Sequence, residues 1–122
     1  QALSAMGVDA FVVRHSESGV PQFLAEHLPS TVSIINAGDG HHAHPTQALL
    51  DIFTIQQHKP KIEALSVAIV GDISHSRVAR SQVALLQKLG VNDIRLIAPK
   101  SLLPTDLTGS SLTHFTDLNQ GI

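Results

Sequence analysis

Short apolar runs alternate with helical segments along this 122-residue chain, and this alternation is the feature that most restricts its fold. Residues 10–13, 32–35, 66–70 and 94–98 predict strands, and residues 112–115 predict a fifth. Segments 19–27, 45–57 and 77–89 predict helices between them. Strand–helix–strand repetition with nearly continuous apolar strands is typical of parallel sheets covered by helices, so we expect an α/β fold.

Individual residues set the predicted helix boundaries. Pro45 suits the first turn of a helix, because its missing N–H needs no partner there. Ser76 is placed to cap the helix over 77–89, and Gly90 ends it. Helical spacing predicts one buried side for each of the two longer helices, formed by Leu49, Ile52, Phe53 and Gln56 and by Val78, Leu85, Leu86 and Leu89.

The stretch His58-Lys59-Pro60-Lys61 breaks the pattern and predicts a linker between two half-domains. Ligands of parallel sheets lie beyond the carboxyl ends of the strands. Arg14, residues 38–44 and residues 71–77 all follow strands, so we expect the halves to face each other across a cleft. The chain opens with what reads as a helix tail closed by Gly7, without an initiator Met, and we expect a piece of a longer protein.

The most informative motif begins with Asn36-Ala37-Gly38-Asp39-Gly40, a glycine-rich loop that runs into the helix at Pro45. A helix N-terminus presents unpaired N–H groups and a positive dipole end. His44 stands directly before this helix, and Gln47 lies in its first turn. Such an arrangement suits a small anionic or carbonyl-bearing ligand.

Each of these features also has a plainer interpretation. Gly38-Asp39-Gly40 and Gly71-Asp72 could each be a simple turn between a strand and a helix. Neither extends to a G-x-G-x-x-G or Walker A motif, which would indicate a nucleotide-binding site. His41 and His42 are adjacent in a loop without Cys or a nearby Glu, so we expect no metal site and no cofactor. Arg14 and Arg77 could form surface ion pairs, although arginine also binds phosphate and carboxylate groups bidentately.

Composition excludes several classes of function. The net charge is −2 without a basic stripe, and aromatic residues are nearly absent, so we expect no nucleic acid partner. There is no cysteine, which removes thiol chemistry and leaves a cytoplasmic enzyme as the simplest expectation. No apolar run approaches the roughly 18 residues of a membrane span.

Two long segments are similar to the signature of aspartate carbamoyltransferase catalytic chains. The first is the motif at residues 36–40 followed by residues 44–55, which begin His44-Pro45-Thr46-Gln47. The second, residues 67–81, matches the opening of the family's aspartate domain and contains His75-Ser76-Arg77. Residues 13–15 are similar to its first-domain strand exit. Ornithine carbamoyltransferases share the His-Pro-x-Gln element, but their second-domain turn typically lacks His-Ser-Arg.

The resemblance implies Rossmann-like parallel sheets with flanking helices, in two partial domains joined by a connecting helix. Residues 1–58 would be the C-terminal part of a carbamoyl phosphate-binding domain with that helix, and residues 59–122 the N-terminal part of an aspartate-binding domain. Arg14 and His44 would contact the carbonyl oxygen of carbamoyl phosphate, with Arg14 also near the phosphate. Gln47 would hold the carbamoyl amino group, and Arg77 the α-carboxylate of aspartate.

The resemblance also implies carbamoyl transfer to L-aspartate in pyrimidine biosynthesis, and a homo-oligomer, a trimer, with possible regulatory or dihydroorotase-like subunits. The family's Ser-x-Arg-Thr phosphate loop, its mobile loop with Ser and Lys, and its late aspartate-selecting Arg have no counterpart in this sequence. We therefore expect the chain alone to be inactive. An ornithine-type or other amino-acid carbamoyltransferase, and a non-catalytic scaffold that keeps the fold, remain alternatives.

Overall fold

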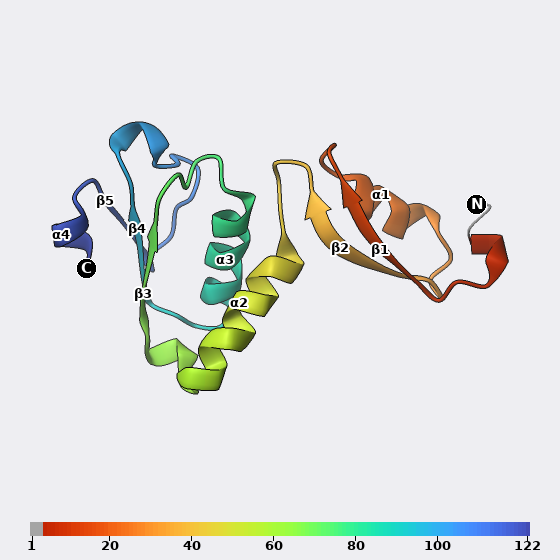
Figure 1. Ribbon diagram of the computed structural model, residues 1–122, viewed down its shortest axis with the longest axis horizontal. Helices are drawn as coiled ribbons and strands as arrows, with labels where there is room; N and C mark the ends of the chain where they lie inside the picture. Colours follow the sequence, from red (N-terminus) through yellow and green to blue (C-terminus); the bar gives the residue numbers. More distant parts are fainter. Residues whose placement is uncertain (1–3) are drawn as a thin grey trace.

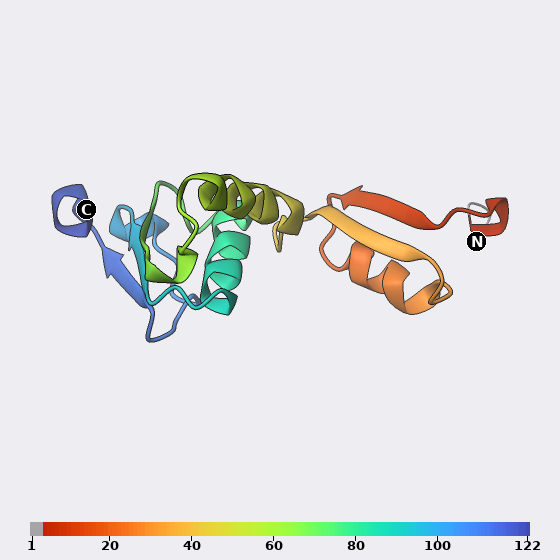
Figure 2. The ribbon, with the colours of Figure 1, turned by 90° about the horizontal axis from the view of Figure 1, so that it is seen from below.

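The computed structural model describes residues 4–122 and contains two parallel sheets (Figure 1). The first sheet pairs β1 (Ala10–His15) with β2 (Ser33–Asp39), and α1 (Val20–His27) connects the two strands. The long helix α2 (Pro45–His58) leads out of this half. Figures 1 and 2 show the first sheet with α1 at one end of an elongated molecule and α2 extending from it toward the second sheet.

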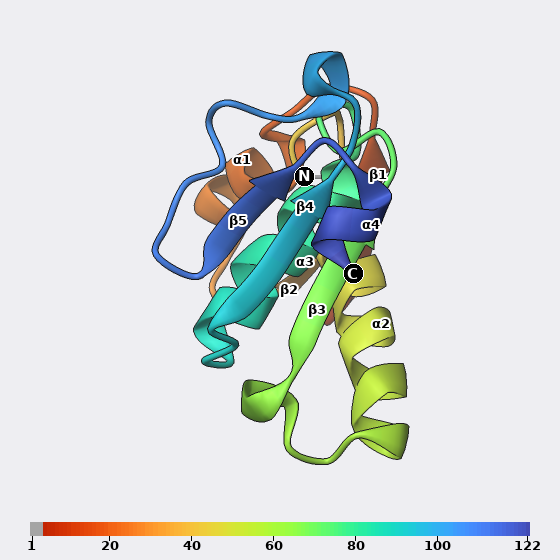
Figure 3. The same ribbon diagram turned by 90° about the vertical axis from the view of Figure 1, so that its left-hand side faces the viewer.

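The second half has strand order β3-β4-β5, with all neighbours parallel. Its elements are β3 (Ser66–Val70), α3 (Arg77–Lys88), β4 (Asp93–Ile97), β5 (Leu112–Phe115) and α4 (Leu118–Gly121). Figures 1 and 3 show α2 and α3 on one face of this sheet and the short α4 on the other. The expected α/β class with parallel sheets and flanking helices is confirmed.

Local residue chemistry explains the helix boundaries. The Ser76 hydroxyl accepts a hydrogen bond from the Ala79 N–H at 3.1 Å, as an N-cap should. Gly90 follows α3 with a φ of 80°, a conformation that favours glycine at a helix end. Pro45 occupies the first turn of α2, and the helix ends at His58, two residues before Pro60. These boundaries agree with the sequence predictions.

The hydrophobic core lies in the second half and on the side of α2 that faces it. Buried apolar residues among those described run from Ala48 to Ala98 and centre on α3 and β4. The predicted buried side of α2 is only partly right: Ile52 is buried, but Leu49 and Phe53 are 56% and 62% exposed. The reason is that α2 packs chiefly against one neighbour, α3. This helix covers only part of the apolar side of α2 that the sequence pattern predicts to be buried.

Other predictions need correction. The second strand does not end at residue 35 but continues through the glycine-containing segment to Asp39, because β1 continues to pair with it. The short helices η2 (Ile62–Ala64), η3 (Lys100–Leu102) and α4 were not predicted. The short helix η1 (Ser4–Met6) lies directly before Gly7, where the sequence predicts the end of a helix. The expected N-terminal helix tail lies partly outside the described residues. In residues 4–122, no helix has the length and apolar character needed to cross a membrane.

Candidate functional site

An irregularity in the first sheet places Arg14 next to Gly38. Val13 pairs with Asn36 and His15 pairs with Asp39, so β2 has one residue more than β1 between these two pairs. Such bulges redirect side chains and are common next to functional sites. Gly38 has a φ of 142°, and a Cβ built there would lie 3.3 Å from the Cγ of Arg14. The bulge and the glycine therefore let the arginine cross closely over β2.

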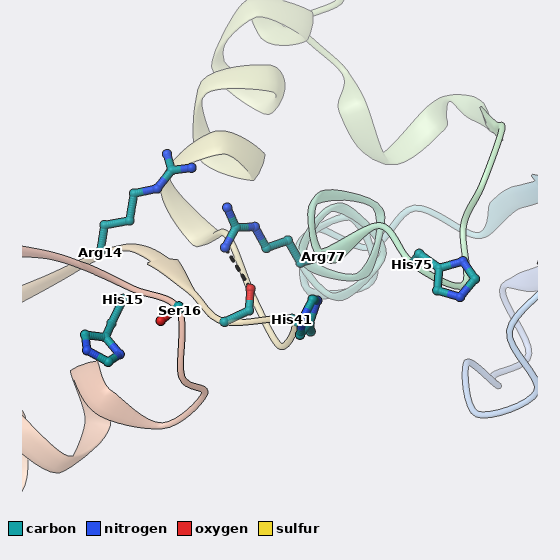
Figure 4. Close-up of a pocket in the computed structure, with 7 residues that line it drawn as sticks. Arg14, His15, Ser16, His41, His75 and Arg77 are labelled. Atoms are coloured by element: carbon teal, nitrogen blue, oxygen red, sulfur yellow. Dashed lines mark hydrogen bonds between the residues drawn. The ribbon is translucent and has the colours of Figure 1, made fainter.

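Arg77 reaches the same point from the other half of the molecule. It is the first residue of α3, and its Nη1 donates a hydrogen bond of 2.7 Å to the carbonyl oxygen of Gly40. The same nitrogen lies 3.5 Å from the Cβ position of Gly38. Figure 4 shows the guanidinium groups of Arg14 and Arg77 extending to the same side of this segment. Two arginines from different halves of the molecule, one on a strand and one on a helix, thus meet above one glycine.

Both arginines line a cavity of about 650 Å³ between the two halves. The other lining residues are His15, Ser16, Gly40, His41 and His75. No carboxylate belongs to this lining, and Arg14 makes no side-chain hydrogen bond or ion pair within residues 4–122. Guanidinium groups without carboxylate partners favour phosphate and carboxylate ligands. The cavity is therefore suited to a small molecule with negative charge.

His44 and Gln47 do not belong to the lining of this cavity. The backbone N–H of His44 donates to the Ser81 hydroxyl at 2.9 Å, one turn of α3 beyond Arg77. The His44 ring nitrogen Nδ1 is 3.4 Å from the Thr46 hydroxyl. Of the four predicted site residues, the structure brings Arg14 and Arg77 together in the lining. It leaves out His44, which precedes α2, and Gln47, which lies in the first turn of that helix.

Asp39 holds the loops around the cavity. The residue is 5% exposed, and its carboxylate accepts a hydrogen bond from the backbone N–H of Gly19 at 2.6 Å. Its backbone forms an isolated antiparallel bridge with Ala43. This one residue therefore connects the start of α1 to the segment between β2 and α2. A buried carboxylate with such backbone contacts stabilises the loops on which Arg14 and Gly40 depend.

Sequence reasoning missed part of the lining. The sequence places His41 in a loop and assigns it no role, and it is exposed, but it borders the cavity together with His15 and His75. The His75 Nδ1 lies 2.9 Å from both carboxylate oxygens of Asp72. The position of His75 two residues before Arg77 was the available signal. In the described part of the chain, no group of three His, Asp or Glu side chains is arranged to hold a metal ion.

Residues 1–57 match the family described as aspartate/ornithine carbamoyltransferase, carbamoyl-P binding domain. The catalytic subunit of M. jannaschii aspartate transcarbamoylase is 33% identical over 97% of this chain and 40% of its own, with a TM-score of 0.79. The chain belongs to the carbamoyltransferase family.

Aspartate transcarbamoylase from Trypanosoma cruzi is a second such neighbour. Its complex with N-(phosphonacetyl)-L-aspartic acid is 30% identical over 86% of this chain and 35% of its own, with a TM-score of 0.73. Its complex with carbamoyl phosphate and aspartate is 30% identical over 86% and 33%, with a TM-score of 0.70. The chain thus spans two fifths or less of these carbamoyltransferase structures.

Proposed function

We propose that this chain is the middle of an aspartate carbamoyltransferase catalytic chain. Residues 1–58 form the C-terminal part of the carbamoyl phosphate-binding domain with the connecting helix, and residues 59–122 the N-terminal part of the aspartate-binding domain. The family match to residues 1–57 and the separate sheets on either side of α2 support this division. The observation that carries the proposal is the meeting of Arg14 and Arg77 over Gly38 in one cavity.

The proposed reaction transfers the carbamoyl group of carbamoyl phosphate to the amino group of L-aspartate, giving N-carbamoyl-L-aspartate and phosphate, a step of pyrimidine biosynthesis. Arg14 and His44 contact the carbonyl oxygen, and Arg14 also approaches the phosphate. Gln47 accepts a hydrogen bond from the carbamoyl amino group, and Arg77 binds the α-carboxylate of aspartate. The placement of the two arginines on opposite halves supports one substrate on each half.

These residue types fit the chemistry of the step. When the amine attacks the carbonyl carbon, negative charge develops on the carbonyl oxygen. Positioned donors that meet this charge typically contribute about 3–4 kcal/mol each in comparable sites. Holding both reactants in attack geometry between the two halves supplies a further part of the rate enhancement. No covalent enzyme nucleophile is needed.

The choice of amino acid is tested by an assay on the complete native polypeptide that carries these residues. Carbamoyl phosphate is supplied with aspartate, with ornithine, or with neither, and carbamoylated product is measured. We expect product with aspartate only. Product with ornithine only would place the protein among ornithine-type enzymes, and no product with any amino acid, despite folded protein, would favour a non-catalytic scaffold.

Kinetics of two variants separate the proposed roles. His44→Ala should lower kcat far more than it weakens carbamoyl phosphate binding, because its hydrogen bond strengthens as the carbonyl oxygen becomes negative. Arg77→Ala should chiefly raise the KM for aspartate, since a carboxylate contact holds ground state and transition state alike. If His44→Ala left kcat within about twofold of wild type, the carbonyl role of His44 would be wrong.

The family resemblance further supports a homotrimer of the complete chain that works in the cytoplasm, with possible regulatory or dihydroorotase-like subunits. Sedimentation of the native protein tests the assembly. A monomer at the concentration of the activity assay, with full activity, would contradict it.

A further inference from the structure

One carboxylate receives two side-chain amides from different helices. The Nε2 of Gln47 donates to the Oδ1 of Asp51 at 3.0 Å, one turn along α2. The Nε2 of Gln82, in α3, donates to the other oxygen of the same carboxylate. All three side chains are partly buried. Within residues 4–122, Asp51 forms no ion pair with an arginine or lysine.

The surroundings of Asp51 strengthen these contacts. Asp51 and Gln82 lie at a cavity of about 310 Å³ between α2, β3 and α3, whose other walls are apolar. A hydrogen bond in such surroundings is stronger than the same bond in water, and hydrogen bonds to a charged group are stronger than neutral ones. The two glutamine amides therefore donate to the Asp51 carboxylate the hydrogen bonds that an arginine or lysine would otherwise provide.

A carboxylate only accepts hydrogen bonds, so a glutamine that contacts it must present its NH₂ group. The side-chain carbonyl oxygen of Gln47 is then the end that is turned away from Asp51. That oxygen is an acceptor, the group required to hold the amino end of a carbamoyl ligand. If the amide were rotated by a half-turn, its NH₂ group would face the ligand's NH₂ group instead.

We propose that Asp51 is a positioning residue that fixes the side-chain amide of Gln47 with its carbonyl oxygen available to the ligand. This inference rests on the proposed function of Gln47. Gln82 extends the arrangement to α3, the helix that also carries Arg77 and Ser81. The orientation of the carbamoyl-binding amide thus depends on the docking of the helix that binds the second substrate.

Calorimetry with carbamoyl phosphate and with inorganic phosphate, on the complete native polypeptide, tests the role of Asp51. Asp51→Leu keeps the branched shape of the side chain and removes both acceptors, so it should weaken carbamoyl phosphate binding about tenfold. Inorganic phosphate has no amino group, and its affinity should stay within about twofold. Asp51→Asn should have a smaller effect than Asp51→Leu, because the introduced amide still accepts from one glutamine.

Glu26 offers a matched control. Its Oε1 accepts from the Nε2 of Gln22 at 2.7 Å, one turn apart on the exposed face of α1. Gln22 and Glu26 thus form an equivalent glutamine–carboxylate pair at the same helical spacing, away from the cavity at Asp51. Glu26→Leu should leave both affinities unchanged.

A double variant separates positioning from general stability. In a Gln47→Ala background, Asp51→Leu should cause no further loss of carbamoyl phosphate affinity. The inference would be overturned if Asp51→Leu lost the same affinity for both ligands, or if it bound carbamoyl phosphate as tightly as wild type. It would also be overturned if Asp51→Leu caused the same loss of carbamoyl phosphate affinity in the Gln47→Ala background. Absence of carbamoyl transfer to aspartate by the wild-type protein would overturn the proposed function instead, and the binding measurements would still decide the role of Asp51.

Discussion

Gly38 is the residue on which the two arginines converge, and this makes it sensitive to a single methyl group. A Cβ at this position would lie 3.3 Å from Arg14 and 3.5 Å from Arg77, at a backbone φ of 142°. We expect Gly38→Ala to destabilise the protein by about 1 kcal/mol through the backbone conformation. It should also weaken inorganic phosphate binding severalfold, since the Arg14 side chain, whose Cγ would be too close to the new methyl group, must shift.

Gly71 provides the matched control for this prediction. Its φ is 133°, close to that of Gly38, but a Cβ there would have no neighbour within 4 Å. Gly71→Ala should therefore cost similar stability, measured by thermal melting, without weakening phosphate binding. Equal loss of affinity in both variants would show that backbone strain alone accounts for the effect.

At the residue scale, the sequence predicted which residues could form a site, but not how they come together. Arg14 was predicted because it lies at the end of a strand, and Arg77 because it ends the segment between a strand and the next helix. Their meeting over Gly38 depends on a bulge and on the docking of α3, and neither leaves a pattern in the sequence. The same applies to His41, whose place in the cavity lining depends on how the two halves sit together.

At the scale of elements, the start of α3 depends on its cap. The Ser76 hydroxyl pairs with the Ala79 N–H, one of the unpaired donors of the first turn. Ser76→Ala should lower the free energy of unfolding by about 1 kcal/mol. Ser101 is exposed in η3 and makes no side-chain hydrogen bond within the described residues, so Ser101→Ala should leave stability unchanged in the same denaturant titration.

The contact between α3 and the loop after η3 should depend on pH. The Arg80 guanidinium donates to both carboxylate oxygens of Asp106, at 2.5 and 3.2 Å, and this holds the pKa of Asp106 below its usual value. A lowered folded-state pKa stabilises the protein above the unfolded value of about 3.9. That stabilisation is lost as the pH falls from there through the folded-state pKa.

Thermal melts of wild type and Asp106→Asn across the acidic range measure this effect. The difference between the two melting temperatures should shrink as the pH drops below about 4. In an Arg80→Ala background the pH-dependent part of the difference should disappear. A difference that stayed constant with pH would show that Asp106 does not act through its charge.

Most elements could be predicted because their signals are local. The strand over residues 66–70 and the capped helix after Ser76 depend on apolar runs, capping side chains and glycines within a few residues. The extension of β2 to Asp39 could not be predicted, because the glycine-containing segment reads as a loop until β1 pairs with it. The short α4 begins at an Asp117 cap within a polar stretch and has few apolar residues to indicate a helix.

At the scale of the whole molecule, the two halves differ in how well they are packed. Every buried apolar residue of the core lies between Ala48 and Ala98 in the described part of the chain. In the first sheet, Val12 and Ile35 are 71% and 43% exposed. Local stability follows buried apolar contacts, so the halves should not open together.

Hydrogen exchange measures this difference directly. Backbone amides of β3, β4 and α3 should exchange slowly, at rates set by global unfolding. Amides of β1 and β2 should exchange faster, although they are paired in a sheet, because little apolar surface holds that sheet together. Equal protection in both sheets would show that the first sheet is stabilised by contacts other than apolar burial.

The distance between the guanidinium groups of Arg14 and Arg77 depends on how far the two halves of the molecule are opened. Arg14 moves with the first sheet, whereas Arg77 moves with α3, which holds Gly40 and His44 through its first two turns. A rotation between the halves that breaks the hydrogen bond from Arg77 to Gly40 therefore changes the separation of the two cations. A ligand with an anionic group at each end can satisfy both only at one length, so a series of dianions of increasing length would report the angle between the halves.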